Sequence, residues 1–183
     1  MNPSYLGLGS NLGDRLGMLR QGLRELAVRG VDIRRVSSVY ETDPVDFLDQ
    51  DSFLNLAVEA VWEGTPEELL KRCLAAEQAL GRVRVIKNGP RSLDIDILLA
   101  GNLVRKGRGL EIPHPRMHMR RFVLVPLEEI APGACHPVMR LTARELLDRC
   151  SDTAGVRRAG ESLTVEPPDP SRYNPAASRG KDG

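Results

Sequence analysis

Residues Gly89–Leu99 read "GPRSLDIDILL", an apolar stretch that contains two aspartates. Carboxylates are disfavoured in strands and are rarely buried without a partner. Because side chains alternate between the two faces of a strand, Asp94 and Asp96 share one face, and the other face carries Leu93, Ile95, Ile97 and Leu99. The stretch therefore predicts a strand over residues 93–100 with one face in a core and the other on a polar site.

Three more segments favour strands: residues 4–8, the β-branched residues 31–40, and residues 53–61 ("FLNLAVEAV"). In the last, Leu54, Leu56, Val58 and Ala60 fall on one face. Phe53, Asn55, Ala57 and Glu59 fall on the other.

Leucines at positions 16, 19, 23 and 26 predict a helix ending near Arg29, capped by Ser10 or Asn11. "TPEE" at 65–68 begins a second helix, which Gly81 ends. "TARELLDRC", with Thr142 and Glu145 as a capping box, predicts a last helix. "FVLVPLEEIAP" fits either a strand or a helix.

The predicted order is strand, helix, strand, strand, helix, strand, which is typical of an α+β ferredoxin-like sandwich. In that fold an antiparallel sheet has helices packed on one face, and we expect the other face to hold loops and ligands. We predict one domain over residues 1–150. Residues 151–183 are rich in Pro, Gly, Ser and charge, which predicts a disordered tail.

The bulk properties favour a cytoplasmic protein. The 183 residues include three cysteines without a C-x-x-C spacing, no signal-peptide pattern and no apolar run near the ~20 residues of a membrane span. The net charge of +1 conceals a basic segment, residues 81–121, which has ten Lys/Arg and three acids. Such a segment either binds an anionic partner or is a set of solvated loops.

The paired aspartates allow two interpretations. They can form salt bridges with Arg82, Arg84 or Arg91. Alternatively, they can hold Mg²⁺, which binds one or two carboxylates together with substrate phosphates, while the arginines bind phosphate oxygens.

Three other side chains are ambiguous in the same way. Phe53 and Asn55 can read a flat heterocycle or form an ordinary half-exposed strand face. His114, between two prolines, can contact phosphate or pack in a loop.

Taken together, "GLGSNLGD", "SSVYETDPV", "FLNLAV", "GRVR", "GPRSLDIDILL", "IPHPRMHMRRFVLVPLEEIAP" and the "HP" at His136 resemble the 6-hydroxymethyl-7,8-dihydropterin pyrophosphokinases of folate biosynthesis, over residues 5–137. The resemblance implies that the pterin hydroxymethyl oxygen attacks the β-phosphorus of ATP and AMP leaves. It also implies small-molecule substrates, neither a nucleic-acid nor a membrane partner, and a monomer.

Site roles follow from the same resemblance. Two Mg²⁺ ions are held by Asp94 and Asp96. The pterin lies between Phe53 and Phe122 and is read by Asn55, Thr42 and Val45. The resemblance assigns ATP binding to Glu77, Arg82, Arg84, Arg91, Ile97, Glu111, His114 and Arg120. Arg82 and Arg91 are the candidates for stabilising charge in the transition state.

Two positions depart from the family pattern. Asn88 stands where many members have a tryptophan, and Gly109 stands where a cation is frequent. Two rival functions stay open: a ferredoxin-like RNA-binding module that uses the basic segment, and a pterin- or nucleotide-binding regulator without catalysis.

Overall fold

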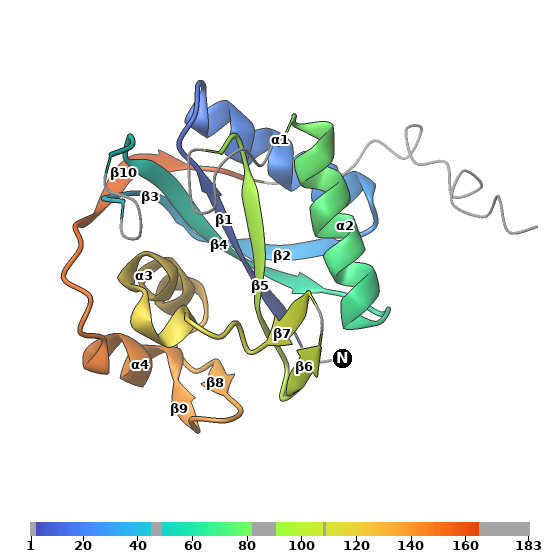
Figure 1. The fold of residues 1–183 in the computed structure, drawn as a ribbon, viewed down its shortest axis with the longest axis vertical. Coiled ribbons are helices and arrows are strands. Elements are labelled where there is room, and N and C mark those ends of the chain that lie inside the picture. The colour runs from blue at the N-terminus through green and yellow to red at the C-terminus, as the bar shows by residue number, and fades with distance from the viewer. Residues whose placement is uncertain (1–2, 45–48, 82–90, 108, 165–183) are drawn as a thin grey trace, which may run out of the picture.

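The computed structural model describes residues 3–44, 49–81, 91–107 and 109–164, and Figure 1 shows their arrangement. The helices are α1 (Arg15–Val28), α2 (Pro66–Ala79), the short 3₁₀ helix η1 (Met117–Met119), α3 (Arg121–Ile130) and α4 (Ala143–Arg149). The strands are β1 (Ser4–Ser10), β2 (Asp32–Val36), β3 (Ser38–Thr42), β4 (Phe53–Val61), β5 (Asp94–Ala100), β6 (Arg105–Gly107), β7 (Leu110–Ile112), β8 (Cys135–His136), β9 (Leu141–Thr142) and β10 (Val156–Ser162).

The main sheet is antiparallel and has the order β10-β3-β4-β1-β5, with β2 also paired to β4. The element order confirms the α+β ferredoxin-like prediction. The single strand predicted over residues 31–40 is wrong, because β2 and β3 are separate strands that meet at Ser37. There the Ser37 N–H donates to the Ala57 carbonyl and the Ala57 N–H donates to Ser37 Oγ, which interrupts the regular ladder.

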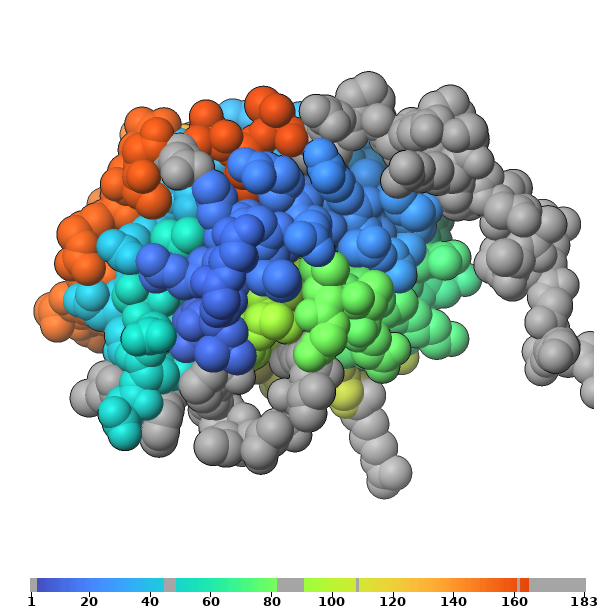
Figure 2. Space-filling view, turned by 90° about the horizontal axis from the view of Figure 1, so that it is seen from above, coloured from blue at the N-terminus to red at the C-terminus, as the bar shows by residue number. Residues whose placement is uncertain are grey.

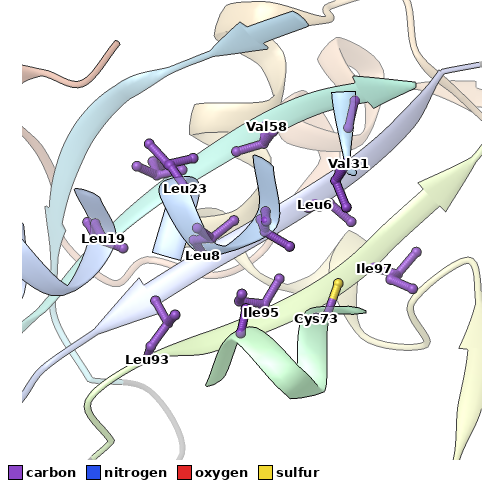
Figure 3. Packing of buried hydrophobic residues seen from close by; sticks show 14 of the residues in the cluster. Leu6, Leu8, Leu19, Leu23, Val31, Val58, Cys73, Leu93, Ile95 and Ile97 are labelled. Carbon is purple, nitrogen blue, oxygen red and sulfur yellow. The ribbon is translucent and has the colours of Figure 1, made fainter. Parts of the chain in front are cut away.

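Helices α1 and α2 cover one face of the sheet. Figure 3 shows Leu19 and Leu23 of α1 and Cys73 of α2 beside Leu8 and Ile95 of the sheet, and all five are buried. In Figure 2 the two helices lie next to each other on this face, α1 in blue and α2 in green.

The helix starts were predicted in part. Thr65 and Thr142 both form complete capping boxes, as predicted. The cap predicted for α1 at Ser10 or Asn11 is wrong, because Asp14 accepts the Gly17 N–H instead.

The opposite face is covered in part by α3, and α4 packs against α3, so the prediction of helices on one face is wrong. "FVLVPLEEIAP" forms α3 because its helical spacing brings Val123, Leu124, Leu127 and Ile130 onto one buried stripe. This stripe packs with Tyr5, Ala57, Leu98 and Leu99 of the sheet.

Strand β5 departs from strict alternation near its end. Tyr5 pairs with Leu99, and Leu6 pairs with Ile97, so Leu98 is an extra residue in β5. The bulge moves Leu99 to the α3 side, whereas Ile95 and Ile97 stay under α1 and α2. The prediction that Leu99 shares their face is therefore wrong.

The chain after residue 150 is not wholly a disordered tail. Residues 156–162 form β10, which pairs with the edge of β3. This pairing provides hydrogen-bond partners for the backbone of both strands, and the polar composition of the segment does not predict it. Figure 2 shows β10 in orange beside the cyan residues of β3. Residues 165–183 lie outside the described part of the chain.

Within the described residues, no helix is both long and apolar enough to cross a membrane.

Candidate functional site

Two glycines of the central strand β1, Gly7 and Gly9, lie on the sheet face opposite the leucine core, and we call them the glycine track. Strand β1 lies between β4 and β5, and its positions opposite the leucine core are Gly7 and Gly9. Gly9 pairs with Asn55 on one side and Asp94 on the other, and Gly7 pairs with Asp96. Sequence reasoning missed these glycines, although period two in "LGLG" places them opposite Leu6 and Leu8.

On the β4 side of this track, predicted pterin-binding residues come together. Asn55 Nδ2 donates to Thr42 Oγ1 over 2.7 Å, and both residues are buried. Phe53 pairs with Thr42 across β3 and β4 and is half-buried. A Cβ on Gly9 would stand 2.5 Å from Asn55 Oδ1, so glycine is required for this packing. Val45 lies outside the described residues.

On the β5 side, the aspartates share the polar face, as predicted. Arg91 Nη1 donates to Asp94 Oδ2 over 2.5 Å, so one of the proposed salt bridges forms. Burial, and then the neighbouring Asp94 carboxylate, raises the pKa of Asp96 to about 6, although Arg120 and Arg91 oppose this.

The donor chemistry at Asp94 and Asp96 fits Mg²⁺. Two carboxylates close enough to raise the pKa of one of them favour a cation between them. Mg²⁺ binds one or two carboxylates and completes its shell with water and phosphate oxygens. No group of three or more His, Cys, Asp or Glu able to hold a metal occurs among the described residues.

His114 lies next to Asp96, and we call the surface formed by Asp94, Asp96 and His114 the carboxylate floor. Its Nε2 lies 3.9 Å from Asp96 Oδ2, and its Nδ1 accepts the N–H of Arg116 over 3.3 Å. That hydrogen bond assigns the proton of the neutral ring to Nε2. Burial, and then Arg120 and Arg116, lowers the pKa of His114 to about 4. The ring is therefore a neutral donor directed toward the carboxylates at pH 7.

Two arginine–phenylalanine pairs flank Asp96. The guanidinium of Arg91 lies 5.8 Å from the centre of the Phe53 ring, and that of Arg120 lies 5.4 Å from the centre of Phe122. Both arginines lower the pKa of Asp96, so both pairs lie near the carboxylate floor. Each predicted aromatic residue thus stands beside a predicted phosphate-binding cation.

The remaining predicted nucleotide contacts differ in placement. Glu77 is buried, and its Oε1 accepts the N–H of Ile95 over 2.7 Å, so it braces β5 from α2. The Ile97 side chain is buried in the core, and Ile97 pairs with Leu6 of β1. Glu111 is exposed on β7, 4.0 Å from Lys106 Nζ. Arg82, Arg84 and Asn88 lie outside the described residues.

Asn11 connects the two sides of the site, a role that sequence reasoning missed. Its N–H donates to the Arg91 carbonyl, and its Oδ1 accepts the Arg91 N–H over 2.9 Å. Its Nδ2 donates to Gln50 Oε1 and to the Asp51 carbonyl. Asn11 is only 2% exposed, so this buried amide fixes Arg91 against the loop before β4. A polar residue directly after the first strand, in "GSN", was the available signal.

Fold and site together define a class of protein: an α+β sandwich in which two carboxylates and their arginines lie beside amide and aromatic side chains on one face of the sheet. Residues 5–132 match the family described as 7,8-dihydro-6-hydroxymethylpterin-pyrophosphokinase (HPPK). The chain belongs to this family.

Curated relatives agree with this assignment. The chain is 44% identical to the 2-amino-4-hydroxy-6-hydroxymethyldihydropteridine pyrophosphokinase of Bacillus subtilis, over 85% of this chain and 89% of that protein. It is 43% identical to the enzyme of the same name from Methylorubrum extorquens, over 86% of this chain and 99% of that one.

Longer relatives match with one part of their length. The chain covers 20% of the folic acid synthesis protein fol1 of Pneumocystis carinii, with 36% identity over 81% of this chain. Among solved structures, the wild-type Plasmodium falciparum HPPK-DHPS with pteroate aligns with a TM-score of 0.63 and 16% identity, over 81% of this chain and 42% of that one. This similarity shows the fold.

Proposed function

We propose that this chain transfers pyrophosphate from ATP to the hydroxymethyl group of 6-hydroxymethyl-7,8-dihydropterin, releasing AMP, in folate synthesis. Beyond family membership, one observation carries this function. The Asp94 and Asp96 face adjoins the Asn55–Thr42 wall across the glycine track of β1. Phosphates and a flat heterocycle can therefore lie side by side on one sheet face.

The pterin is held on the β4 side. Asn55 and Thr42 offer hydrogen-bond donors and acceptors to its polar edge, and Phe53 and Phe122 offer ring faces for stacking. Because Asn55 and Thr42 are buried, a pterin that pairs with them is shielded from water on that side.

The triphosphate is held on the β5 side. Asp94 and Asp96 are the residues that would hold Mg²⁺, which would neutralise charge on the phosphates of ATP. Arg91 and Arg120 bind phosphate oxygens, and the neutral His114 donates its Nε2 proton to another. Among the described residues, the buried Arg91 Nε has no hydrogen-bond partner, which leaves it one donor for a ligand.

The reaction needs positioning and charge stabilisation more than covalent help from protein groups. The pterin hydroxymethyl oxygen forms a bond to the β-phosphorus as the bond from that phosphorus to the oxygen bridging to the α-phosphorus breaks. The hydroxyl proton is released, and AMP carries the bridging oxygen away. Arg91 stabilises negative charge that develops on the transferred group.

The test is AMP formation from ATP, Mg²⁺ and the hydroxymethyldihydropterin. Asp94→Ala and Asp96→Ala should each abolish it, whereas Asp32→Ala, a matched change at an exposed aspartate of β2, should not. Turnover at the wild-type rate in both site variants would exclude the metal-binding role. No AMP formation by the wild-type protein would reject the proposed activity.

A further inference from the structure

The chain that leaves α4 and enters β10 contacts the backbone on both sides of the proposed pterin site. We name residues 152–157 the C-terminal strap. It lies beyond residue 132, where the family match ends, and inside the segment predicted to be a disordered tail. None of its residues is among the predicted site residues.

At one end, the strap holds the start of α3. Asp152 Oδ2 accepts the N–H of Arg121 over 2.8 Å, and Asp152 Oδ1 accepts the N–H of Ala154 over 2.9 Å. Arg121 stands between Arg120, a proposed phosphate ligand, and Phe122, a proposed pterin-stacking ring. Asp152 therefore fixes the turn of backbone from which both side chains extend.

At the other end, the strap holds the end of β3. The Asp43 N–H donates to the Gly155 carbonyl over 3.0 Å, and the Gly155 N–H donates back to Asp43 Oδ2 over 3.1 Å. Arg157 Nη2 adds an ion pair to Asp43 Oδ1 at 3.0 Å. The next strap residue, Val156, pairs with Thr42, which receives the Asn55 hydrogen bond.

Gly155 is required at this second contact because of space. A Cβ there would stand 2.5 Å from Asp43 Oδ2 and 2.9 Å from Arg157 Nη1. Any side chain would push Asp43 away from the strap. The sequence "TAGVR" thus supplies a glycine where the strap must approach β3 closely.

We propose that the C-terminal strap is a positioning element for the proposed pyrophosphokinase reaction: it ties the Phe122 side of the pterin site to the Thr42–Asn55 side and so sets the spacing between them. The inference rests on the proposed function. The strap acts through Arg121 at one end and through Thr42 at the other.

The decisive variants break the strap at each end: Asp43→Ala and Asp152→Ala. Each should raise the KM for the pterin about tenfold, because loss of spacing weakens a two-sided contact. The KM for ATP should stay unchanged in Asp43→Ala, since Asp43 lies on the pterin side. Asp152→Ala should also lower kcat, because Arg120 precedes the backbone group that Asp152 holds.

The two changes should not add. Because breaking either link already frees the strap, the double variant should have nearly the same pterin KM as each single variant. Asp43→Asn and Asp152→Asn keep an acceptor oxygen and should recover part of the loss. The matched control is Asp148→Ala, at an exposed aspartate of α4.

The outcomes separate the two proposals. Wild-type turnover with an unchanged pterin KM in both strap variants would overturn the strap's role and leave the activity standing. A fall in melting temperature, with both KM values unchanged, would show a merely structural role and also overturn it. No turnover by the wild-type protein would overturn the activity and, with it, this inference.

Discussion

The two faces of strands β4, β1 and β5 are built from alternate residues of the same segments, yet they have opposite chemistry. One face carries Leu56, Leu8 and Ile95, which are sealed under α1 and α2. The other carries Asn55, Gly9 and Asp94 at neighbouring positions of the same strands. Stability and ligand chemistry are therefore separated by a single residue step along each strand, and substitutions can test each face alone.

Asp96→Asn on the polar face should give the largest effect. Loss of one of the two carboxylates proposed to hold Mg²⁺ should lower kcat/KM of the proposed reaction by about 10²–10³-fold. The free energy of unfolding should not fall, because the change removes a carboxylate that is partly withdrawn from water and repelled by Asp94. Steady-state kinetics and urea unfolding on one preparation test both statements. A loss of stability comparable with that of a core truncation would contradict this division of the faces.

Leu8→Ala on the opposite face should give the reverse pattern. Leu8 is 1% exposed, and truncating such a leucine costs about 2–5 kcal/mol of unfolding free energy. The KM values for ATP and pterin should stay near those of the wild type at temperatures where the variant is folded. Leu74→Ala, at a 38% exposed leucine of α2, is the matched control and should cost far less. Equal losses at the two leucines would contradict the assignment of the core.

Asn11→Ala should lower both stability and activity, because Asn11 is a buried residue directly after β1 and also holds Arg91. The change removes the acceptor of the Arg91 N–H and the donor to Gln50 and Asp51. We expect this to lower the free energy of unfolding by about 1–3 kcal/mol. Since Arg91 also loses its anchor, kcat should fall roughly tenfold. Asn11→Asp keeps the acceptor for Arg91 but not the donor to Gln50, so it should retain more kcat. Equal kcat in Asn11→Ala and the wild type would exclude this anchoring.

The alternation of the strands made much of both faces predictable. Period two alone assigns Leu54, Leu56 and Val58 to the core and Phe53 and Asn55 to the opposite face of the sheet, and the structure confirms this division. The threonine caps at 65 and 142 were equally local, because a capping box closes within four residues.

The parts that failed depend on tertiary pairing. The bulge at Leu98 arises from register against β1, which no spacing within β5 reveals. β10 is polar in composition and is ordered by the open edge of β3. From the sequence, the Asn11 amide could either cap a helix or link distant segments. Its hydrogen bonds to Arg91 and Gln50, which depend on the tertiary fold, show that it links them. Local sequence patterns thus predict which face of a strand is buried. Pairing at the sheet edge and hydrogen bonds between distant segments depend on the tertiary fold.

A pH series should give the smallest effect and tests how α3 is held on the polar face. Tyr40 of β3 donates its hydroxyl proton to Glu129 of α3 over 2.9 Å. Burial, and then this hydrogen bond, raises the pKa of Tyr40 from 10.0 to about 12. The folded protein thus holds this proton more tightly than the unfolded chain, whose tyrosines titrate near 10. The stabilisation is complete below pH 10 and is lost as the pH rises from 10 to about 12.

Unfolding free energies of wild type and Tyr40→Phe between pH 8 and 11.5 measure this loss. The difference between the two proteins should be constant up to about pH 10 and should shrink above it, because phenylalanine has no proton to lose. Tyr5 also has a raised pKa but is present in both proteins, so its contribution cancels. A difference that stays constant to pH 11.5 would mean that the Tyr40–Glu129 contact does not help to hold α3. The helix would then be held on this face by its apolar stripe and by the two hydrogen bonds that Ser38 donates to Glu129.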